Sequence, residues 1–274
     1  MVEILENEKV FIDNGPIQMV LDISIGDKKT PELGLQVSKY VIYEFNRLAE
    51  YIPYIKNNSF VKIKENRPSA VLKKMINAVE RSGDKSLTPL AAVAGSFSDF
   101  ALEKALELGA TRVIVNNGGD IALKDITGHP LNVGIPLNDT ELVLNITSES
   151  NIKGICTSGL GGRSFTKGIA TAAVSLGENA AIADACASCL GNATNVDNEN
   201  IVRCYAEEID SETDIPGHLV TLKVGDIGEK NVYKALLNGL EKAEELYNKN
   251  IIKGAVLCVK DKIVMVPDNI AVLK

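Results

Sequence analysis

The spacing of apolar and polar residues changes several times along the chain, and each change predicts an element of secondary structure. Residues 17–25 alternate between apolar and polar positions, which is typical of a half-buried strand. Thr30 and Pro31 then supply a helix start, and apolar residues at helical spacing continue to about Tyr51. The beginning of the chain is therefore predicted to form a strand followed by a helix.

A second helix is predicted after Thr88 and Pro89, which repeat the same start signal. Gly109 stands where a glycine that ends a helix is expected. The apolar stripe of this helix consists of Val93, Phe97, Phe100, Ala101 and Leu108. The helix leads into a predicted strand at 112–116.

Most of the remaining elements are strands that come in runs and pairs. They are predicted at 131–135, 141–146, 168–176, 219–224, 254–259 and 263–266. A long amphipathic helix spans about 229–248. This grouping favours an α+β fold, a mixture of sheet and helix with antiparallel hairpins, over a doubly wound sheet. Residues 1–274 are expected to form a single domain, and two intertwined subdomains are the alternative.

Composition and charge narrow the classes of partner. The chain has 274 residues, 45% of them hydrophobic, which suffices for a large core. Its 29 Lys and Arg residues against 36 Asp and Glu give a formal net charge of -7, and without a basic run we expect no nucleic-acid partner. We find no leader-like N-terminal segment and no apolar run of ~18 residues, so we expect a cytoplasmic protein without a membrane partner. Five cysteines, an odd number, argue against a secreted disulfide framework.

The stretch R-V-I-V-N-N-G-G-D-I-A-L at 112–123 has two interpretations. Asn-Gly and Gly-Gly supply the positive φ angles of a tight turn, so a β-hairpin explains the stretch without a ligand. Gly118 and Gly119 would also let a ligand approach the backbone, and Asp120 offers an acceptor at the tip. The residues favour the hairpin, and a hairpin can serve both purposes.

A second glycine-rich stretch, I-C-T-S-G-L-G-G-R-S at 155–164, carries groups suited to phosphate oxygens. The hydroxyls of Thr157 and Ser158, the glycine amides and the guanidinium of Arg163 are close together in the sequence. The chain contains neither a P-loop nor a G-x-G-x-x-G motif. A flexible surface loop has the same composition, so this stretch alone decides nothing.

Residues 177–194 are predicted to form a tightly packed helix because small residues dominate them. Asn179 is the expected N-cap and Gly191 the expected C-terminal stop. At ~100° per residue, Asp184 and Ser188 lie on one face one turn apart, as two oxygen ligands of a hard cation would need. The alternative for Asp184 is a structural carboxylate, which needs a partner in an apolar helix.

Cys186 and Cys189 fall on roughly the opposite face of this helix. They cannot readily share a metal with Asp184, and no second C-x-x-C completes a zinc site. Buried structural thiols are the favoured interpretation, and a redox pair is the alternative.

Three of these stretches together resemble the FAD:protein FMN transferases, the ApbE-type proteins. That family carries, in order, a helix, a V-N-x-G-G-D-I hairpin, a T-S-G loop and an A-D-A-x-A-[TS] helix. This chain reads V-N-N-G-G-D-I at 115–121, T-S-G at 157–159 and A-D-A-C-A-S at 183–188. The resemblance covers about 90–194, and the order of three motifs makes it more specific than any single motif.

The resemblance implies a cleft for FAD and a Mg²⁺ ion, with FMN transferred to a Thr or Ser of an acceptor protein and AMP released. Asp184 and Ser188 would be the metal ligands, and Asp184 would also be the catalytic residue that helps deprotonate the acceptor hydroxyl. The residues that would line the FAD cleft are Asn117, Gly118, Gly119, Asp120, Thr157, Ser158, Gly159 and Arg163. A Mg²⁺ ion on the pyrophosphate would neutralise the charge that develops as its bond breaks.

Two departures from the family pattern make the fold a safer expectation than the activity. The H-x-x-D-P segment that normally follows the T-S-G loop is missing, since the only histidines are His129 and His218. The family's A-K-G-Y lysine is missing from residues 94–97, which read A-G-S-F. Two function classes follow: an enzyme that binds FAD or a related nucleotide, or a cytoplasmic accessory protein of the same fold, for example in sulfur assimilation. The sequence leaves a homo-oligomer open.

Overall fold

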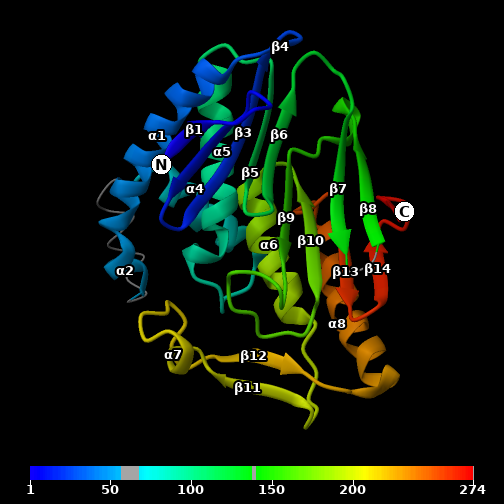
Figure 1. The fold of residues 1–274 in the computed structure, drawn as a ribbon. Helices are drawn as coiled ribbons and strands as arrows, with labels where there is room; N and C mark the ends of the chain where they lie inside the picture. Colours follow the sequence, from blue (N-terminus) through cyan, green and yellow to red (C-terminus); the bar gives the residue numbers. More distant parts are fainter. Residues whose placement is uncertain (57–67, 138–139, 274) are drawn as a thin grey trace.

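The computed structural model describes residues 1–56, 68–137 and 140–273. Within these ranges, ten strands form one antiparallel sheet in the order β1-β2-β3-β5-β6-β9-β10-β13-β14, with β4 paired to β3 (Figure 1). The strands of this sheet are β1 (Val2–Ile4), β2 (Val10–Asn14), β3 (Ile17–Ile25), β4 (Lys28–Lys29), β5 (Arg112–Asn117), β6 (Asp120–Asp125), β9 (Gly154–Ser158), β10 (Ala172–Gly177), β13 (Gly254–Val259) and β14 (Lys262–Val266).

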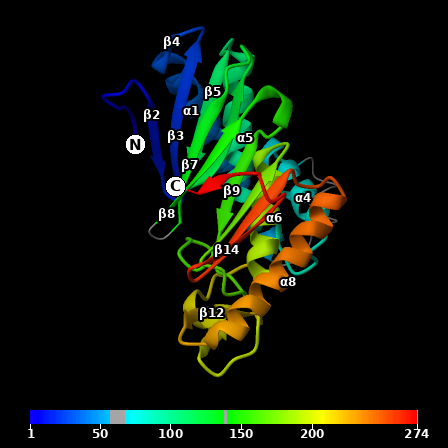
Figure 2. The ribbon, with the colours of Figure 1, turned by 90° about the vertical axis from the view of Figure 1, so that its right-hand side faces the viewer.

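Helices cover one face of this sheet. They are α1 (Pro31–Ala49), α2 (Ile52–Lys56), α4 (Ala70–Ser82), the short 3-10 helix η1 (Pro89–Ala92), α5 (Val93–Glu107), α6 (Ala180–Ala193) and α8 (Gly228–Asn248). α5 packs on β5 and β6, α6 on β9 and β10, and α8 on β13 and β14. Figure 2 shows α4, α6 and α8 on the same side of the sheet.

A second sheet covers the other face of the main sheet. It consists of β7 (Leu131–Leu137), β8 (Thr140–Ile146) and β15 (Val272–Leu273), and the 3-10 helix η2 (Ser148–Ser150) follows β8. Because side chains of a strand alternate between faces, Ala173 of β10 packs with the helices while Val174 packs with Leu142 and Leu144 of β8. The main sheet is thus the middle of three layers, and β10 is buried along its whole length.

The predicted α+β fold is confirmed, and two predicted boundaries are wrong. The strand predicted at 168–176 begins only at Ala172. Residues 168–171 are irregular because Gly168 packs closely on the backbone of α6. Gly191 does not end α6, which continues to Ala193. Its φ angle is not left-handed, so the glycine serves close packing instead of a helix stop.

The helix predicted from Thr30 to about Tyr51 is confirmed as α1, which ends at Ala49, and the short helix α2, which was not predicted, follows it. Pro53 lies in the first turn of α2, where its missing N–H is tolerated, although it could not continue the hydrogen-bond ladder of α1. Strands β1, β2, β9 and β11 and helix α4 were not predicted at all. The short strands offer too few residues for a recognisable period. Helix α4 does carry signals for its two ends, because Ser69 is its N-cap and Gly83 is in the left-handed region after its last residue.

Residues 196–226 form an arm at one end of the three layers (Figure 1). Its strands β11 (Ile201–Tyr205) and β12 (Leu219–Val224) pair with each other, and α7 (Ala206–Ile209) lies in their connection. The N–H of Thr221 donates to the main-chain oxygen of Thr166 at 2.8 Å, and the hydroxyl of Thr88 donates to Asp214. The first bond holds β12 to Thr166, and the second places the connection of the arm against the start of η1.

Helices α5 and α6 pack closely on each other at Gly95. A Cβ atom at this position would lie 2.8 Å from the Cβ of Asp184 and still nearer to the carbonyl oxygen of Ala180. One turn further along α5, the buried carboxylate of Asp99 accepts hydrogen bonds from the N–H groups of Ala180 at 2.9 Å and Ala181 at 2.8 Å. These N-terminal amides have no partner within α6, so Asp99 fixes where α6 begins.

Burial is the largest influence on Asp99 and raises its pKa from 3.8 to about 6. The folded state therefore holds the proton more tightly than the unfolded chain, so this contribution to stability is present below pH 3.8 and is lost as the pH rises through about 6. We expect the free energy of unfolding of the wild type, measured relative to Asp99→Asn, to fall by about 2 kcal/mol between roughly pH 4 and pH 7. Urea unfolding of both proteins measures this difference, and a difference that does not change with pH would contradict the assignment.

Candidate functional site

The V-N-N-G-G-D-I stretch forms a hairpin, as the residues favoured. Strands β5 and β6 are antiparallel and pair Asn117 with Asp120 across the two-residue turn of Gly118 and Gly119. Both glycines have positive φ angles, 66° and 106°, as the tightest hairpin turns require. The side-chain oxygen of Asn116 accepts from the N–H of Gly119 at 2.9 Å and closes the turn.

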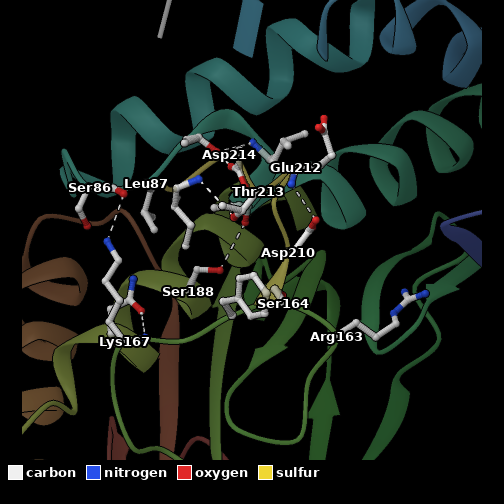
Figure 3. Close-up of a pocket in the computed structure, with 16 residues that line it drawn as sticks. Ser86, Leu87, Arg163, Ser164, Lys167, Ser188, Asp210, Glu212, Thr213 and Asp214 are labelled. Atoms are coloured by element: carbon white, nitrogen blue, oxygen red, sulfur yellow. Dashed lines mark hydrogen bonds between the residues drawn. The ribbon is translucent and has the colours of Figure 1, made fainter. Parts of the chain in front are cut away.

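Arg163 joins this turn to the T-S-G loop. Its guanidinium lies directly on Gly118, where a Cβ atom would overlap it, and donates to the main-chain oxygen of Pro16 at 3.2 Å. Figure 3 shows a pocket that Arg163 helps to line, and in it the guanidinium points away from the other labelled residues. The structure thus brings Gly118 and Arg163, two of the predicted cofactor-binding residues, together. It holds the Arg163 guanidinium against the backbone of the turn and of Pro16.

Asn117 and Asp120 attach the hairpin to its neighbours. The buried amide of Asn117 donates to the main-chain oxygen of Ala94 at 3.2 Å, and the carboxylate of Asp120 accepts from the N–H of Thr157 at 3.2 Å. Ser98 of α5 donates to the main-chain oxygen of Asp120 at 2.9 Å. Desolvation raises the pKa of Asp120 to about 6. Asp120 therefore does not project from the tip of the hairpin but connects β6 to β9.

The T-S-G segment ends β9 and begins a loop closed by backbone hydrogen bonds. Thr157 and Ser158 still pair with β10. Gly159 has a φ angle of 149°, and its carbonyl oxygen accepts from the N–H of Gly162 at 3.1 Å. A Cβ atom on Gly159 would lie 2.6 Å from the main-chain oxygen of Thr171, so the position requires glycine.

Asp184 lies on α6 where this helix meets α5. Its Oδ2 accepts from the N–H of Gly95 at 2.8 Å, and the N–H of Ala94 is a second donor. Desolvation is the main cause that raises the pKa of Asp184 well above its usual value, and the charge of Asp120 acts in the same direction. The hairpin acid and the helix acid are therefore close enough to repel each other.

Ser188 follows Asp184 by one turn and lines a pocket of about 300 Å³ (Figure 3). Its hydroxyl lies 3.5 Å from the main-chain oxygen of Ala91 at the end of η1. Residues 86–91, 163–167 and 210–215 supply the other walls. Among the predicted site residues, Ser188 and Arg163 line this pocket, whereas Asp184 and the predicted residues of the hairpin and of the T-S-G segment are not among its lining residues.

Several pocket residues were not identified from the sequence. Lys167 and Asn192 line the same pocket as Ser188, and the arm contributes Asp210 and Asp214. Asn192 is two turns after Asp184 on the same face of α6, a spacing that could have been noticed. The arm residues belong to the acidic run E-E-I-D-S-E-T-D, which reads as a solvated loop until its contact with η1 is known.

The cysteines of α6 pack in the core, as the sequence favoured. Cys186 and Cys189 are buried thiols, and burial raises the pKa of Cys189 to about 12. Cys156 is also buried, and its thiol donates to the main-chain oxygen of Ala180 at 3.3 Å. In the described part of the chain, no group of three or more His, Cys, Asp or Glu residues could hold a metal ion, and no helix is long and apolar enough to cross a membrane.

Comparison with known proteins assigns the chain to a family. The family model described as "AbpE bacteria" matches residues 3–265. A UPF0280 protein of Methanosarcina barkeri is 36% identical over 160 residues, which are 57% of this chain and 60% of that relative. A UPF0280 protein of Methanococcus vannielii is 30% identical over 239 residues, which are 82% of this chain and 91% of that relative.

A solved structure shares the arrangement of the elements. The crystal structure of the flavinyl transferase ApbE from Pseudomonas stutzeri, in its apo form, aligns with a TM-score of 0.50 and covers 97% of this chain and 94% of that chain. The two sequences are 11% identical, so this likeness concerns the fold. The resemblance to the ApbE-like superfamily that the three motifs indicated is thereby confirmed.

The exposure of the cysteines predicts their reactivity. Cys156, Cys186, Cys189 and Cys258 are buried, and Cys204 is partly exposed on the arm. Because the thiolate is the reactive form and needs access to the reagent, we expect one fast-reacting thiol per native chain, and the other four after unfolding. Titration with a thiol-specific chromogenic reagent measures both numbers. The Cys204→Ser variant should lose the fast phase, and a fast phase that persists in this variant would contradict the burial of the α6 thiols.

Proposed function

We propose that this chain, which belongs to the AbpE bacteria family, binds a flavin nucleotide at the pocket beside α6 and acts on its pyrophosphate with the help of Mg²⁺. The nucleotide is FAD, and the reaction is transfer of FMN to a Thr or Ser of an acceptor protein, or cleavage of FAD. Support comes from the family, from the three motifs and from a fold shared with a flavinyl transferase. The observation that carries the proposal is that Asp184 and Ser188 lie one turn apart on α6, where Asp184 contacts Gly95 at the start of α5 and Ser188 contacts Ala91 of η1.

These groups fit a magnesium ion chemically. A carboxylate, a hydroxyl and the carbonyl oxygen of Ala91 form a donor set of oxygen atoms only, as Mg²⁺ prefers. Magnesium in enzymes commonly keeps several waters and takes one or two carboxylates together with substrate phosphates. Asp184 and Ser188 would therefore hold the ion only with the help of a ligand phosphate, which agrees with the lack of a larger acidic cluster among the described residues.

The electrostatics of Asp184 support a role in proton transfer. Because burial and Asp120 raise the pKa of its carboxyl, this group can accept a proton nearer to neutral pH than an exposed aspartate. A cation beside Asp184 would also offset the repulsion between the two acids. When bound, Mg²⁺ would stabilise the charge that develops on the pyrophosphate oxygens. The chain itself would orient the acceptor hydroxyl and take up its proton at Asp184.

The alternative is an accessory protein that carries a flavin in the same pocket, or that takes part in sulfur assimilation. A carrier would bind FAD without releasing AMP. A sulfur-handling role would need accessible thiols, and four of the five cysteines are buried. The structure therefore favours the nucleotide pocket over the cysteines as the functional centre.

Removing the carboxylate should uncouple nucleotide binding from magnesium. We expect Asp184→Ala to weaken FAD binding in the presence of Mg²⁺ by about tenfold or more and to abolish AMP release, because a metal ligand and a negative charge are lost. Ser188→Thr should retain binding because it keeps the hydroxyl, whereas Ser188→Ala should weaken it. Calorimetric titration with FAD, with and without Mg²⁺, and chromatographic detection of AMP measure these effects.

Two variants serve as controls for this experiment. Asp197→Ala removes an exposed acid at the base of the arm and should leave FAD binding unchanged. Asp120→Ala should perturb the cleft but leave the magnesium dependence in place. If the wild type binds no FAD with or without Mg²⁺, the flavin proposal is wrong. If it binds FAD but releases no AMP, the accessory protein takes its place.

A further inference from the structure

Helix α6 carries one row of polar side chains, of which Ser188 and Asn192 line the pocket. Asp184, Ser188 and Asn192 are spaced by four residues, so they lie on one face in three successive turns. The first two are the proposed metal ligands. Asn192 lies at the other end of the row and belongs to none of the three motifs.

Asn192 is oriented by the backbone of Lys167. Its Oδ1 accepts from the N–H of Lys167 at 2.9 Å, and only the amide oxygen can accept that bond. The two N–H donors of the amide are therefore left for another partner. Because Asn192 lines the pocket, a ligand there can receive these donors.

Lys167 adds a positive charge next to this amide. Its ammonium donates to the main-chain oxygen of Ser86 at 3.3 Å, and two of its three N–H donors remain available. Its carbonyl oxygen accepts from the hydroxyl of Thr221 at 3.4 Å, so both main-chain polar groups of the residue are held in place. Figure 3 shows the side chain extending toward Ser86 on one wall, with Ser188 nearby.

No carboxylate is within ion-pair distance of the Lys167 ammonium in the described part of the chain. Asp84 and Asp214 are the acids that influence it from further away. Asp84 accepts from Ser86, and Asp214 accepts from the hydroxyl of Thr88, so both carboxylates already have partners. Half-burial lowers the pKa of Lys167, which indicates a cation that a bound anion would stabilise.

We propose that Lys167 and Asn192 bind a phosphate group of the nucleotide directly beside the metal ligands on α6. A phosphate accepts hydrogen bonds from several directions, which suits an ammonium, an amide and the hydroxyl of Ser188 arranged around one pocket. Three acids of the arm, Asp210, Glu212 and Asp214, also line the pocket, and Figure 3 shows them on the side away from the base of Lys167, so the Lys167 end is the place for the anion. The proposal rests on the proposed function in taking this phosphate to be part of a flavin nucleotide.

The neutral variant Lys167→Met tests the charge while keeping a long side chain. We expect it to weaken the binding of inorganic pyrophosphate and of FAD by about tenfold, both measured by calorimetry in Mg²⁺. Lys167→Arg should lose less than Lys167→Met because the charge is kept. Adenosine and riboflavin, which lack phosphate, should bind the wild type and Lys167→Met equally, including the case in which neither binds detectably.

Two further variants separate binding from folding. Asn192→Leu removes the amide donors and should weaken pyrophosphate binding, while Lys230→Met removes an exposed lysine of α8 and should change nothing. Urea unfolding midpoints of all variants show whether the native state persists. If Lys167→Met does not fold, the loss of pyrophosphate affinity in Asn192→Leu, compared with that in Lys167→Arg, decides whether the phosphate site exists.

The outcomes distinguish this proposal from the flavin proposal. Pyrophosphate binding that depends on Lys167 in a protein that does not bind FAD would support the phosphate site and reject the flavin function. FAD binding that is equal in the wild type and Lys167→Met would reject the phosphate site and leave the flavin function standing. A wild type that binds neither pyrophosphate nor FAD would overturn both.

Discussion

The close crossing of α5 and α6 is the constraint on which the candidate site depends. At Gly95 the two helices are so near that a methyl group would not fit, and the amide of Gly95 binds the carboxylate of Asp184. One turn away, Asp99 holds the first amides of α6. Both acids of this crossing are therefore satisfied by backbone donors. A shift of either helix would move Asp184 away from the hairpin and Ser188 away from η1.

The same crossing gathers acids that an ordinary core would avoid. Asp120 approaches Asp184 from the hairpin, and both carboxyls have a raised pKa chiefly because they are removed from water. Acids with a strongly raised pKa are a common property of functional sites. Here the donors from α5 and β9 explain how the acids are tolerated.

The sequence was sufficient for the elements with a clear period and for the motifs, but not for the pocket. The hairpin at Gly118 and the N-cap at Asn179 could be predicted because each depends on a few neighbouring residues. The pocket could not, because residues far apart in the chain meet there and their spacing leaves no local pattern. Lys167 directly precedes the segment 168–176 that was predicted as a strand, and only the packing of Gly168 on α6 shows why the start of that segment is irregular. Asp214 reads as one acid of a solvated run until the hydroxyl of Thr88 is found beside it.

The arm at 196–226 has a consequence for how such proteins can diverge. Its two strands pair only with each other, so it adds a wall to the pocket without contributing a strand to the ten-stranded sheet. Connecting segments of this kind tolerate insertion and replacement far better than buried strands do. A descendant could therefore exchange the arm, and with it the acids of one wall, while inheriting α5, α6 and the hairpin intact. The lining of the pocket on the side of the arm and the crossing of α5 and α6 can then change independently of each other.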